Sequence, residues 1–78
     1  MKLEILTPDK KLFDGEASSV IVPGTEGSMG ILDFHAPMIT TLKGGKIKVK
    51  TKSAGELTFE IRGGVLEVLK NSVVVLAE

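Results

Sequence analysis

Residues 22–37 hold the side chains of this chain that are best suited to chemistry or binding. Their sequence is VPGTEGSMGILDFHAP, and it includes the only histidine, His35, with Asp33 two positions before it. Histidine beside a carboxylate occurs in nucleophilic enzymes and around metal ions. The chain has no cysteine and no second histidine to complete a metal-ligand set. We therefore expect no catalytic residue and no metal site, although spacing alone leaves a glycosidase-like carboxylate pair open.

The glycines of this segment raise a second possibility, a phosphate-binding loop. A P-loop ends in Gly-Lys-Ser/Thr and opens a helix, whereas here residues 28–32 have the pattern of a strand. We therefore expect no bound nucleotide and no cofactor. Gly24, Gly27 and Gly30, with the flanking prolines, instead predict a shaped loop, and such loops on rigid scaffolds are common binding sites. His35 then either holds the loop by hydrogen bonds or contacts another protein.

Length and composition predict one small domain, residues 1–78. A chain of 78 residues without cysteine has neither a large core nor a disulfide framework. The N-terminal sequence MKLEILTP lacks the apolar run of a signal peptide, and no segment approaches the roughly 20 apolar residues of a spanning helix. We expect a soluble protein that docks on a membrane complex without inserting into the bilayer.

The charges are balanced overall, with 10 basic and 10 acidic residues, but they are unevenly placed. Residues 34–55 contain five lysines and no acid, which raises nucleic-acid binding as a possibility. These lysines mostly alternate with apolar residues, as on the solvated face of a strand. The chain also has three Phe and neither Tyr nor Trp, so it lacks the aromatic platforms that bind single strands. We expect no nucleic-acid partner.

Alternation of apolar and polar residues predicts an all-β fold. Frequent Gly and Pro divide the chain into short strands, and we expect a small flattened β-sandwich or barrel of about 8–10 short, mostly antiparallel strands. The expected strands are residues 3–7, 17–22, 28–32, 38–42, 46–52, 56–62, 65–69 and 72–77. Pro8-Asp9 and Asp14-Gly15 supply turn chemistry between the first of them.

The clearest hairpin joins residues 46–52 to residues 56–62 through a Ser53-Ala54-Gly55 loop. A register centred on Ala54 places opposite charges together on the wet face and apolar residues together on the buried face. The four expected pairs are Lys52–Glu56, Lys48–Glu60, Val49–Phe59 and Ile47–Ile61, each contributing about 0.2–1 kcal/mol. A second hairpin turns at Lys70-Asn71, and the unbroken apolar run of residues 73–76 predicts a strand covered on both faces.

Several large apolar residues flank the Gly/Pro segment, and a sandwich of this size cannot bury all of them easily. We expect one or two of Met29, Ile31, Leu32, Met38 and Ile39 to lie at an interface with another protein. An alternative class is a biotinyl or lipoyl carrier domain, which presents one modified lysine at a tight turn. Lys70 occupies such a turn, but its neighbours Leu69 and Asn71 fit that pattern poorly.

Three motifs together resemble a known family. They are TP-x-x-x-x-F-x-G from Thr7, VPG-x-EG-x-x-GIL-x-x-HAP from Val22, and GG-x-x-EV-x-x-N-x-V-x-VLA from Gly63. Their order and spacing are similar to the N-terminal β domain of the epsilon subunit of F-type ATP synthases, over the whole chain. The resemblance implies a central-stalk subunit of a proton- or sodium-translocating synthase, with no catalysis of its own, on the cytoplasmic face of the bacterial plasma membrane.

The resemblance also implies two partners, the γ subunit and the polar loops of the c-ring. By position, the residues expected to face the c-ring are Thr25, Glu26, Gly27, Ser28 and Met29. Those expected to face γ are His35, Ala36, Pro37, Met38 and Thr40, with Thr7 as a weaker candidate. Ser28 stands where several relatives carry an acid, so Glu26 is the better source of a charged contact with the ring.

The C-terminal helical hairpin of the family inhibits ATP hydrolysis and in some members binds ATP. These 78 residues contain no counterpart of it, so we expect coupling and assembly without that inhibition and without bound nucleotide.

Overall fold

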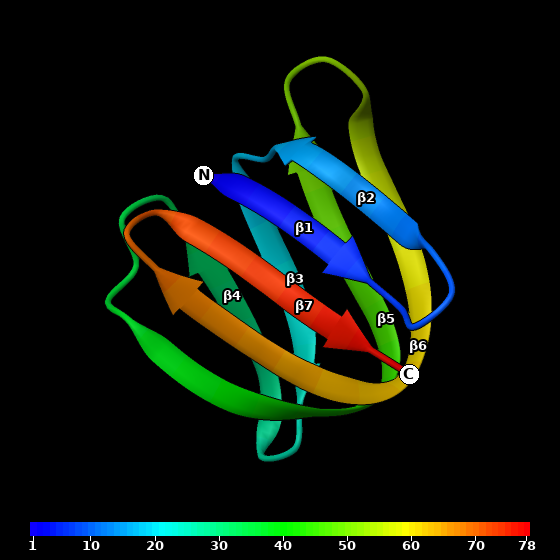
Figure 1. Cartoon of the computed structure of the whole chain (residues 1–78). Coiled ribbons are helices and arrows are strands. Elements are labelled where there is room, and N and C mark those ends of the chain that lie inside the picture. Colours follow the sequence, from blue (N-terminus) through cyan, green and yellow to red (C-terminus); the bar gives the residue numbers. More distant parts are fainter.

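All regular elements of the chain are β-strands. The structure is a computed structural model that describes residues 1–78, and Figure 1 shows its seven strands. They are β1 (Lys2–Leu6), β2 (Lys11–Glu16), β3 (Ser19–Gly24), β4 (Gly27–Leu32), β5 (Met38–Thr51), β6 (Gly55–Leu69) and β7 (Ser72–Ala77). The structure contains no helix of the length and apolarity needed to span a bilayer. The expected all-β class is confirmed.

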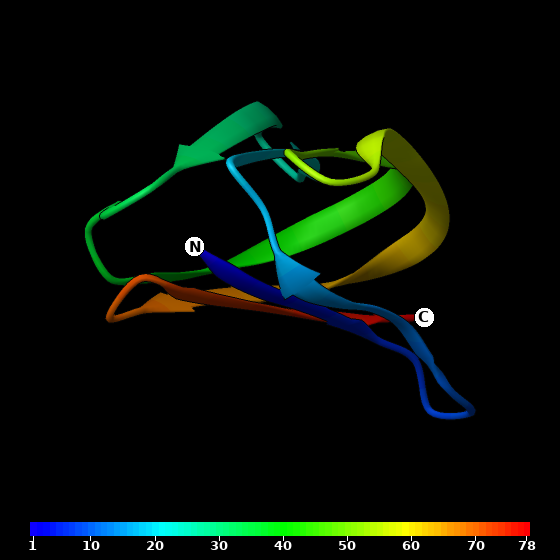
Figure 2. The same ribbon diagram turned by 90° about the horizontal axis from the view of Figure 1, so that it is seen from above.

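The strands form one sheet in the order β2-β1-β7-β6-β5-β3-β4. Every neighbouring pair is antiparallel except β1 and β7, which run parallel. Figure 2 shows this sheet folded back on itself: β1, β2 and β7 lie in one layer, β3 and β4 lie in the other, and β5 and β6 bend from one layer into the other. The folded sheet therefore makes the expected sandwich.

The number and length of the strands differ from the expectation of eight to ten short ones. β5 has 14 residues and β6 has 15, because each joins two segments that were expected to be separate strands. The separating glycines, Gly44-Gly45 and Gly63-Gly64, do not end the strands. The two glycine pairs lie next to one another along the β5–β6 ladder, where Gly63 pairs with Lys43, Gly64 with Leu42 and Gly45 with Ile61. Because glycine lacks a side chain, the ladder can bend sharply here without being interrupted.

Gly64 shows how close the strands come at this bend. A Cβ atom on Gly64 would lie 2.3 Å from the carbonyl oxygen of Leu76 in β7, and the φ of Gly64 is +153°. No other residue type fits this position without movement of the backbone, since the clashing atom belongs to the main chain of the neighbouring strand.

The first hairpin also differs from the prediction. Asp14-Gly15 lies inside β2 and forms no turn, because Glu4 of β1 pairs with Asp14 and Leu3 with Gly15. The chain turns earlier, where the hydroxyl of Thr7 accepts a hydrogen bond from the amide of Lys10 at 3.1 Å. The amide of Thr7 donates to the carbonyl of Lys10 at 2.8 Å, which closes the turn around Pro8-Asp9.

The β5–β6 hairpin has the expected faces but another register. Its three-residue loop is Lys52-Ser53-Ala54, so Lys50 pairs with Glu56 and Lys46 with Glu60, two residues away from the predicted register. The apolar pairs shift likewise, to Val49–Leu57 and Ile47–Phe59. The reason is local, because the hydroxyl of Thr51 accepts from the amide of Ala54 at 2.8 Å and donates to the carbonyl of Gly55 at 3.0 Å. A shift of two residues keeps every side chain on its original face.

The β6–β7 turn at Lys70-Asn71 is confirmed, with φ of +50° and +58° at its two residues. The prediction that residues 73–76 are covered on both faces is wrong. Val73 and Val75 are buried, whereas Val74 is half-buried and Leu76 is 55% exposed. The neighbours of β7 pair with its edges, and only the opposite layer of the sandwich covers one of its faces.

The core lies between the two layers and contains only apolar side chains. Sixteen hydrophobic residues are buried, and no polar or charged residue is buried with them. The fully buried side chains with the largest volumes are Leu3, Ile5, Ile31, Ile47 and Leu66. Phe13 and Phe59 pack against this cluster with their rings at 62° and their centroids 6.0 Å apart, a favourable edge-to-face geometry.

Candidate interaction surfaces

The turn between β3 and β4 is the region expected to face a c-ring. Thr25 and Glu26 form its tip and are exposed. Thr25 is fixed to β5, because its amide donates to the carbonyl of Thr41 at 3.1 Å and the two threonine hydroxyls lie 3.0 Å apart. The tip therefore stands on a tethered hairpin that presents the carboxylate of Glu26 to the solvent.

The remaining residues expected to face the ring point in different directions. Ser28 is exposed on the outer face of β4. Met29 is half-buried and packs against the hydrophobic core, and Gly27 has a φ of +132° at the end of the turn. Thr25, Glu26 and Ser28 are thus the side chains that this turn makes available to a partner.

The β4–β5 loop, residues 33–37, contains the histidine. The amide of His35 donates to the carbonyl of Leu32 at 3.3 Å, and its ring Nδ1–H donates to the carbonyl of Ala36 at 2.7 Å. The side chain is only half-buried and still accessible. Both interpretations of His35 therefore remain compatible with its geometry, since it holds the loop and can also be reached by a partner.

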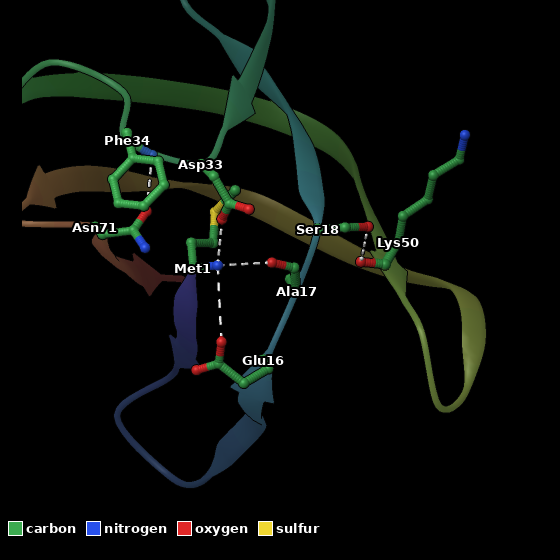
Figure 3. Close-up of polar contacts among 8 residues, drawn as sticks. All are labelled: Met1, Glu16, Ala17, Ser18, Asp33, Phe34, Lys50 and Asn71. Carbon is green, nitrogen blue, oxygen red and sulfur yellow. Dashed lines mark hydrogen bonds and ion pairs between the residues drawn. The ribbon is translucent and has the colours of Figure 1, made fainter.

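Asp33 does not orient His35, contrary to the possibility that their spacing suggested. Its carboxylate lies 2.5 Å from the α-ammonium group of Met1, which also donates to the carbonyl of Ala17 at 2.9 Å (Figure 3). Glu16 adds a longer ionic contact of 3.8 Å to the same ammonium group. The end of β4 is therefore fastened to the start of β1. The side chains also form no cluster of three or more His, Cys, Asp or Glu residues that could hold a metal ion.

Phe34 is the prominent residue that the sequence did not single out. It is 83% exposed, and its φ is +61°, in the left-handed region that bulky residues rarely occupy. Its amide donates to the side-chain oxygen Oδ1 of Asn71 at 2.8 Å, across to the β6–β7 turn (Figure 3). A phenylalanine between Asp33 and His35 carries no sequence signal for this conformation.

The β4–β5 loop meets the β6–β7 turn at one end of the domain (Figures 1 and 2). Four exposed apolar residues lie in this loop or in the strands next to the two connections. We call them the end patch: Leu32 (65% exposed), Phe34 (83%), Ile39 (72%) and Leu69 (52%). A shallow groove beside them is lined by Pro37, Met38, Ile39, Glu67, Val68 and Leu69. Of the five flanking residues, Leu32 and Ile39 are exposed and Ile31 is buried. That one or two of them lie at an interface with another protein stays a prediction.

The residues expected to face γ are only partly brought together. Residues 35–38 and Thr40 are contiguous at the start of β5, beside the end patch, with Met38 half-buried against the core. Thr7 follows the far end of β1 and is separated from β5 by β7 and β6. Three strand spacings amount to about 14 Å. Thr7 therefore lies apart from the others and closes the β1–β2 turn.

These features define a class: a small β-sandwich with two exposed loop regions, one at each end of β4. Residues 1–78 match the family described as "ATP synthase, Delta/Epsilon chain, beta-sandwich domain". The chain belongs to this family, as the three sequence motifs indicated.

Two relatives named "ATP synthase epsilon chain" illustrate the match. The protein from Chlorobium limicola is 43% identical over 77 residues, covering 99% of this chain and 88% of its own length. The protein from Chlorobaculum tepidum is 43% identical over 76 residues, covering 97% and 86%. A chain in the cryo-EM structure of the Euglena gracilis mitochondrial ATP synthase, OSCP/F1/c-ring, shares the fold with a TM-score of 0.88. That chain is 22% identical, and this one covers 48% of its length.

The carrier alternative gains no support from these comparisons, because the relatives are epsilon chains and the family domain is that of ATP synthase. Lys70 is exposed at a tight turn, as the hypothesis requires. However, its neighbour Asn71 is engaged by the amide of Phe34, which gives the turn a structural role.

Proposed function

We propose that this chain is the epsilon-type rotor subunit in the central stalk of an F-type ATP synthase. It binds γ and contacts the c-ring, so that rotation of the ring is coupled to ATP synthesis, and it has no catalytic activity of its own. The observation that carries the proposal is the match of the whole chain, residues 1–78, to the Delta/Epsilon β-sandwich family, together with relatives named as epsilon chains.

The placement of the two contact regions supports a coupling role. The β3–β4 turn and the β4–β5 loop lie at opposite ends of β4, whose six residues span about 20 Å. Both regions are tethered to the sheet, the turn through Thr25 and the loop through Asp33. A domain that holds two partners at opposite ends of a rigid strand can transmit torque between them.

We assign the c-ring contact to the β3–β4 turn, residues 25–29. Glu26 supplies the charge and Ser28 a neutral hydrogen-bonding group, while Met29 supports the turn from the core side. We assign the γ contact to His35, Ala36, Pro37, Met38 and Thr40, together with the exposed Ile39 beside them. Thr7 stabilises the β1–β2 turn in this scheme and lies outside the contact.

The proposed location is the cytoplasmic face of a bacterial plasma membrane, held there through the complex. The coupling ion is a proton or sodium, and no nucleotide binds to this domain. ATP should therefore leave the midpoint of thermal unfolding unchanged, because only a ligand that binds the folded state raises it. A saturable rise with ATP concentration would contradict the absence of a nucleotide site.

Binding to purified γ subunit tests the central claim. We expect wild-type protein to form a stable complex with γ, and the double substitution His35→Ala, Met38→Ala to raise the dissociation constant by at least about tenfold, or 1.4 kcal/mol. Ile21→Ala is the control, because Ile21 is 44% exposed in β3, away from the γ region. Unchanged affinity in a double variant that retains its β-sheet circular dichroism would reject the γ assignment.

The ring contact needs a separate experiment in the assembled synthase. A single cysteine at position 26 should form a disulfide with a cysteine in the polar loop of a c subunit, since the chain has no cysteine of its own. Cysteine at position 67, in β6, serves as the control. If position 67 cross-links to the ring and position 26 does not, the orientation proposed here is wrong.

A further inference from the structure

Phe34 is the most exposed large apolar residue of the chain, at 83%. Exposure alone says little, because single apolar residues are common on protein surfaces. Its backbone is what sets Phe34 apart from Leu32 and Ile39. The φ of +61° is costly for a side chain with a Cβ atom, and it has no role in burying the ring.

This backbone conformation is imposed from two sides. On one side Asp33 is bound to the ammonium group of Met1, and on the other the amide of Phe34 is bound to Asn71 (Figure 3). Asn71 is itself fixed in a turn with a φ of +58°. Strained residues persist where the surrounding structure determines them fully, and they concentrate at functional sites. The loop therefore exposes an aromatic ring to solvent from a fixed backbone position.

The position of Phe34 distinguishes between the two proposed partners. The residue follows the end of β4, whereas the β3–β4 turn that we assign to the c-ring precedes its start. Phe34 is adjacent in sequence to His35, and its amide is bound to Asn71, two positions after Leu69, which lines the shallow groove together with Ile39. Phe34 is therefore continuous in sequence with the region that we assign to γ, and it lies at the opposite end of β4 from the turn that we assign to the c-ring.

We propose that Phe34 is the anchor of the γ contact and that Asn71 is its positioning residue. The ring of Phe34 enters an apolar pocket on γ, and the hydrogen bond from its amide to Asn71 fixes the backbone that carries the ring before binding, so that less backbone freedom is lost on association. Large side chains that fill a desolvated pocket dominate the binding energy of many interfaces. This inference rests on the proposed function, since it specifies how the same partner is bound.

Phe34→Gly is the decisive variant because its expected effects on binding and on stability have opposite signs. Glycine removes the ring and relieves the backbone, so the dissociation constant for γ should rise at least about tenfold while the stability of the free protein is kept or increased. Phe34→Tyr should bind nearly as well as wild type. Ile21→Ala should change neither property, since Ile21 lies on β3 outside the end patch.

Asn71→Gly tests the positioning role separately. Glycine tolerates the positive φ of the turn but removes the oxygen that accepts from the amide of Phe34. We expect a smaller loss of affinity than for Phe34→Gly, and no further loss when the Asn71→Gly change is added to Phe34→Gly. Additive losses in the double variant would show that Asn71 acts independently of Phe34.

The outcomes separate this inference from the function beneath it. If wild-type protein binds γ and the Phe34→Gly variant binds equally well, the assignment of Phe34 as the anchor is wrong and the proposed function stands. If wild type does not bind γ, both are wrong. If the Phe34→Gly variant binds γ normally but, unlike wild type, no longer co-sediments with vesicles of anionic phospholipid, the phenyl ring contacts a membrane surface. The assignment of Phe34 as the anchor of the γ contact is then wrong as well.

Discussion

The amide of Phe34 donates a hydrogen bond to Oδ1 of Asn71 over 2.8 Å, joining two residues that are 37 positions apart. Both residues have a positive φ, +61° and +58°. Asn71 favours that conformation, because asparagine tolerates the left-handed region, whereas Phe34 does not. The β6–β7 turn therefore imposes the conformation of the β4–β5 loop, and the loop presents an aromatic ring to the solvent.

Phe34→Gly should raise the free energy of unfolding by up to about 1.5 kcal/mol. Relief of a strained left-handed residue gains about 1–2 kcal/mol, and the greater freedom of glycine in the unfolded chain removes about 0.5–1 kcal/mol of it. Leu32→Gly is the matched control, because Leu32 is similarly exposed but lies in a strand with ordinary φ, so it should lose stability. Urea denaturation measures both, and a loss in Phe34→Gly equal to that in Leu32→Gly would show that the loop is unstrained.

Gly64→Ala should destabilise the fold by about 2–3 kcal/mol. The new Cβ would lie 2.3 Å from the carbonyl oxygen of Leu76, so β6 and β7 would have to separate at the bend. Gly30→Ala should leave stability unchanged or raise it by up to about 1 kcal/mol, because a Cβ there meets nothing within 4 Å and alanine suits a strand better. Chemical denaturation of the two variants side by side provides the comparison, and equal effects would contradict the close approach at Gly64.

The register of the β5–β6 hairpin can be tested with engineered disulfides, since the chain has no cysteine. Lys48 pairs with Thr58, so cysteines at positions 48 and 58 should be close enough to oxidise to a disulfide. Cysteines at positions 48 and 60, which the sequence pattern favours as partners, should remain largely reduced. Mass spectrometry after mild oxidation distinguishes the two, and preferential cross-linking of positions 48 and 60 would restore the register expected from sequence.

The pKa of Lys11 should fall when Asp14 is replaced by Asn. The hydrogen bond and the charge of Asp14, 3.0 Å away, raise the pKa of Lys11 above its ordinary value of 10.5, and Glu4 at 3.7 Å adds to the effect. Because the folded-state pKa is the higher one, the stabilisation is present below about pH 10.5 and is lost as the pH rises through the folded-state pKa.

An NMR titration of the Lys11 side chain checks this dependence. Asp9→Asn is the control, because it removes a nearby acid that makes no contact with Lys11. A Lys11 pKa that does not change in the Asp14→Asn variant would contradict the assigned cause.

Local patterns predicted those parts of the fold that depend on neighbouring residues. Alternation identified which side of β5 is buried, since Ile47 and Val49 are buried and the lysines between them are exposed. The turn at Lys70-Asn71 was also predicted. The strand number was not predicted, because Gly44-Gly45 and Gly63-Gly64 look like strand ends although the β5–β6 ladder continues through both. The hairpin register was not predicted either. The hydroxyl of Thr51, which sets the loop, gives no periodic signal.

For the candidate interaction surfaces too, the sequence predicted one part and only the structure showed the rest. The shaped segment from Val22 to Pro37 was evident from its glycines and prolines, and its motifs identified the family. The tertiary structure decided which side chains are available: it turned Met29 toward the core, placed Thr7 away from the loop, and bound Asp33 to the ammonium group of Met1.

The sequence by itself determined the all-β class, the buried face of the β5–β6 hairpin and the family, because these depend on residue types at fixed spacings. Only the tertiary structure decided that Phe34 is held in solvent by Asn71. That contact depends on how two turns meet after the sheet has folded over, and no local preference of phenylalanine points to a left-handed, exposed conformation. The sequence of residues 22–37 therefore predicts a binding loop, and only the folded structure identifies the residue that we propose as its anchor.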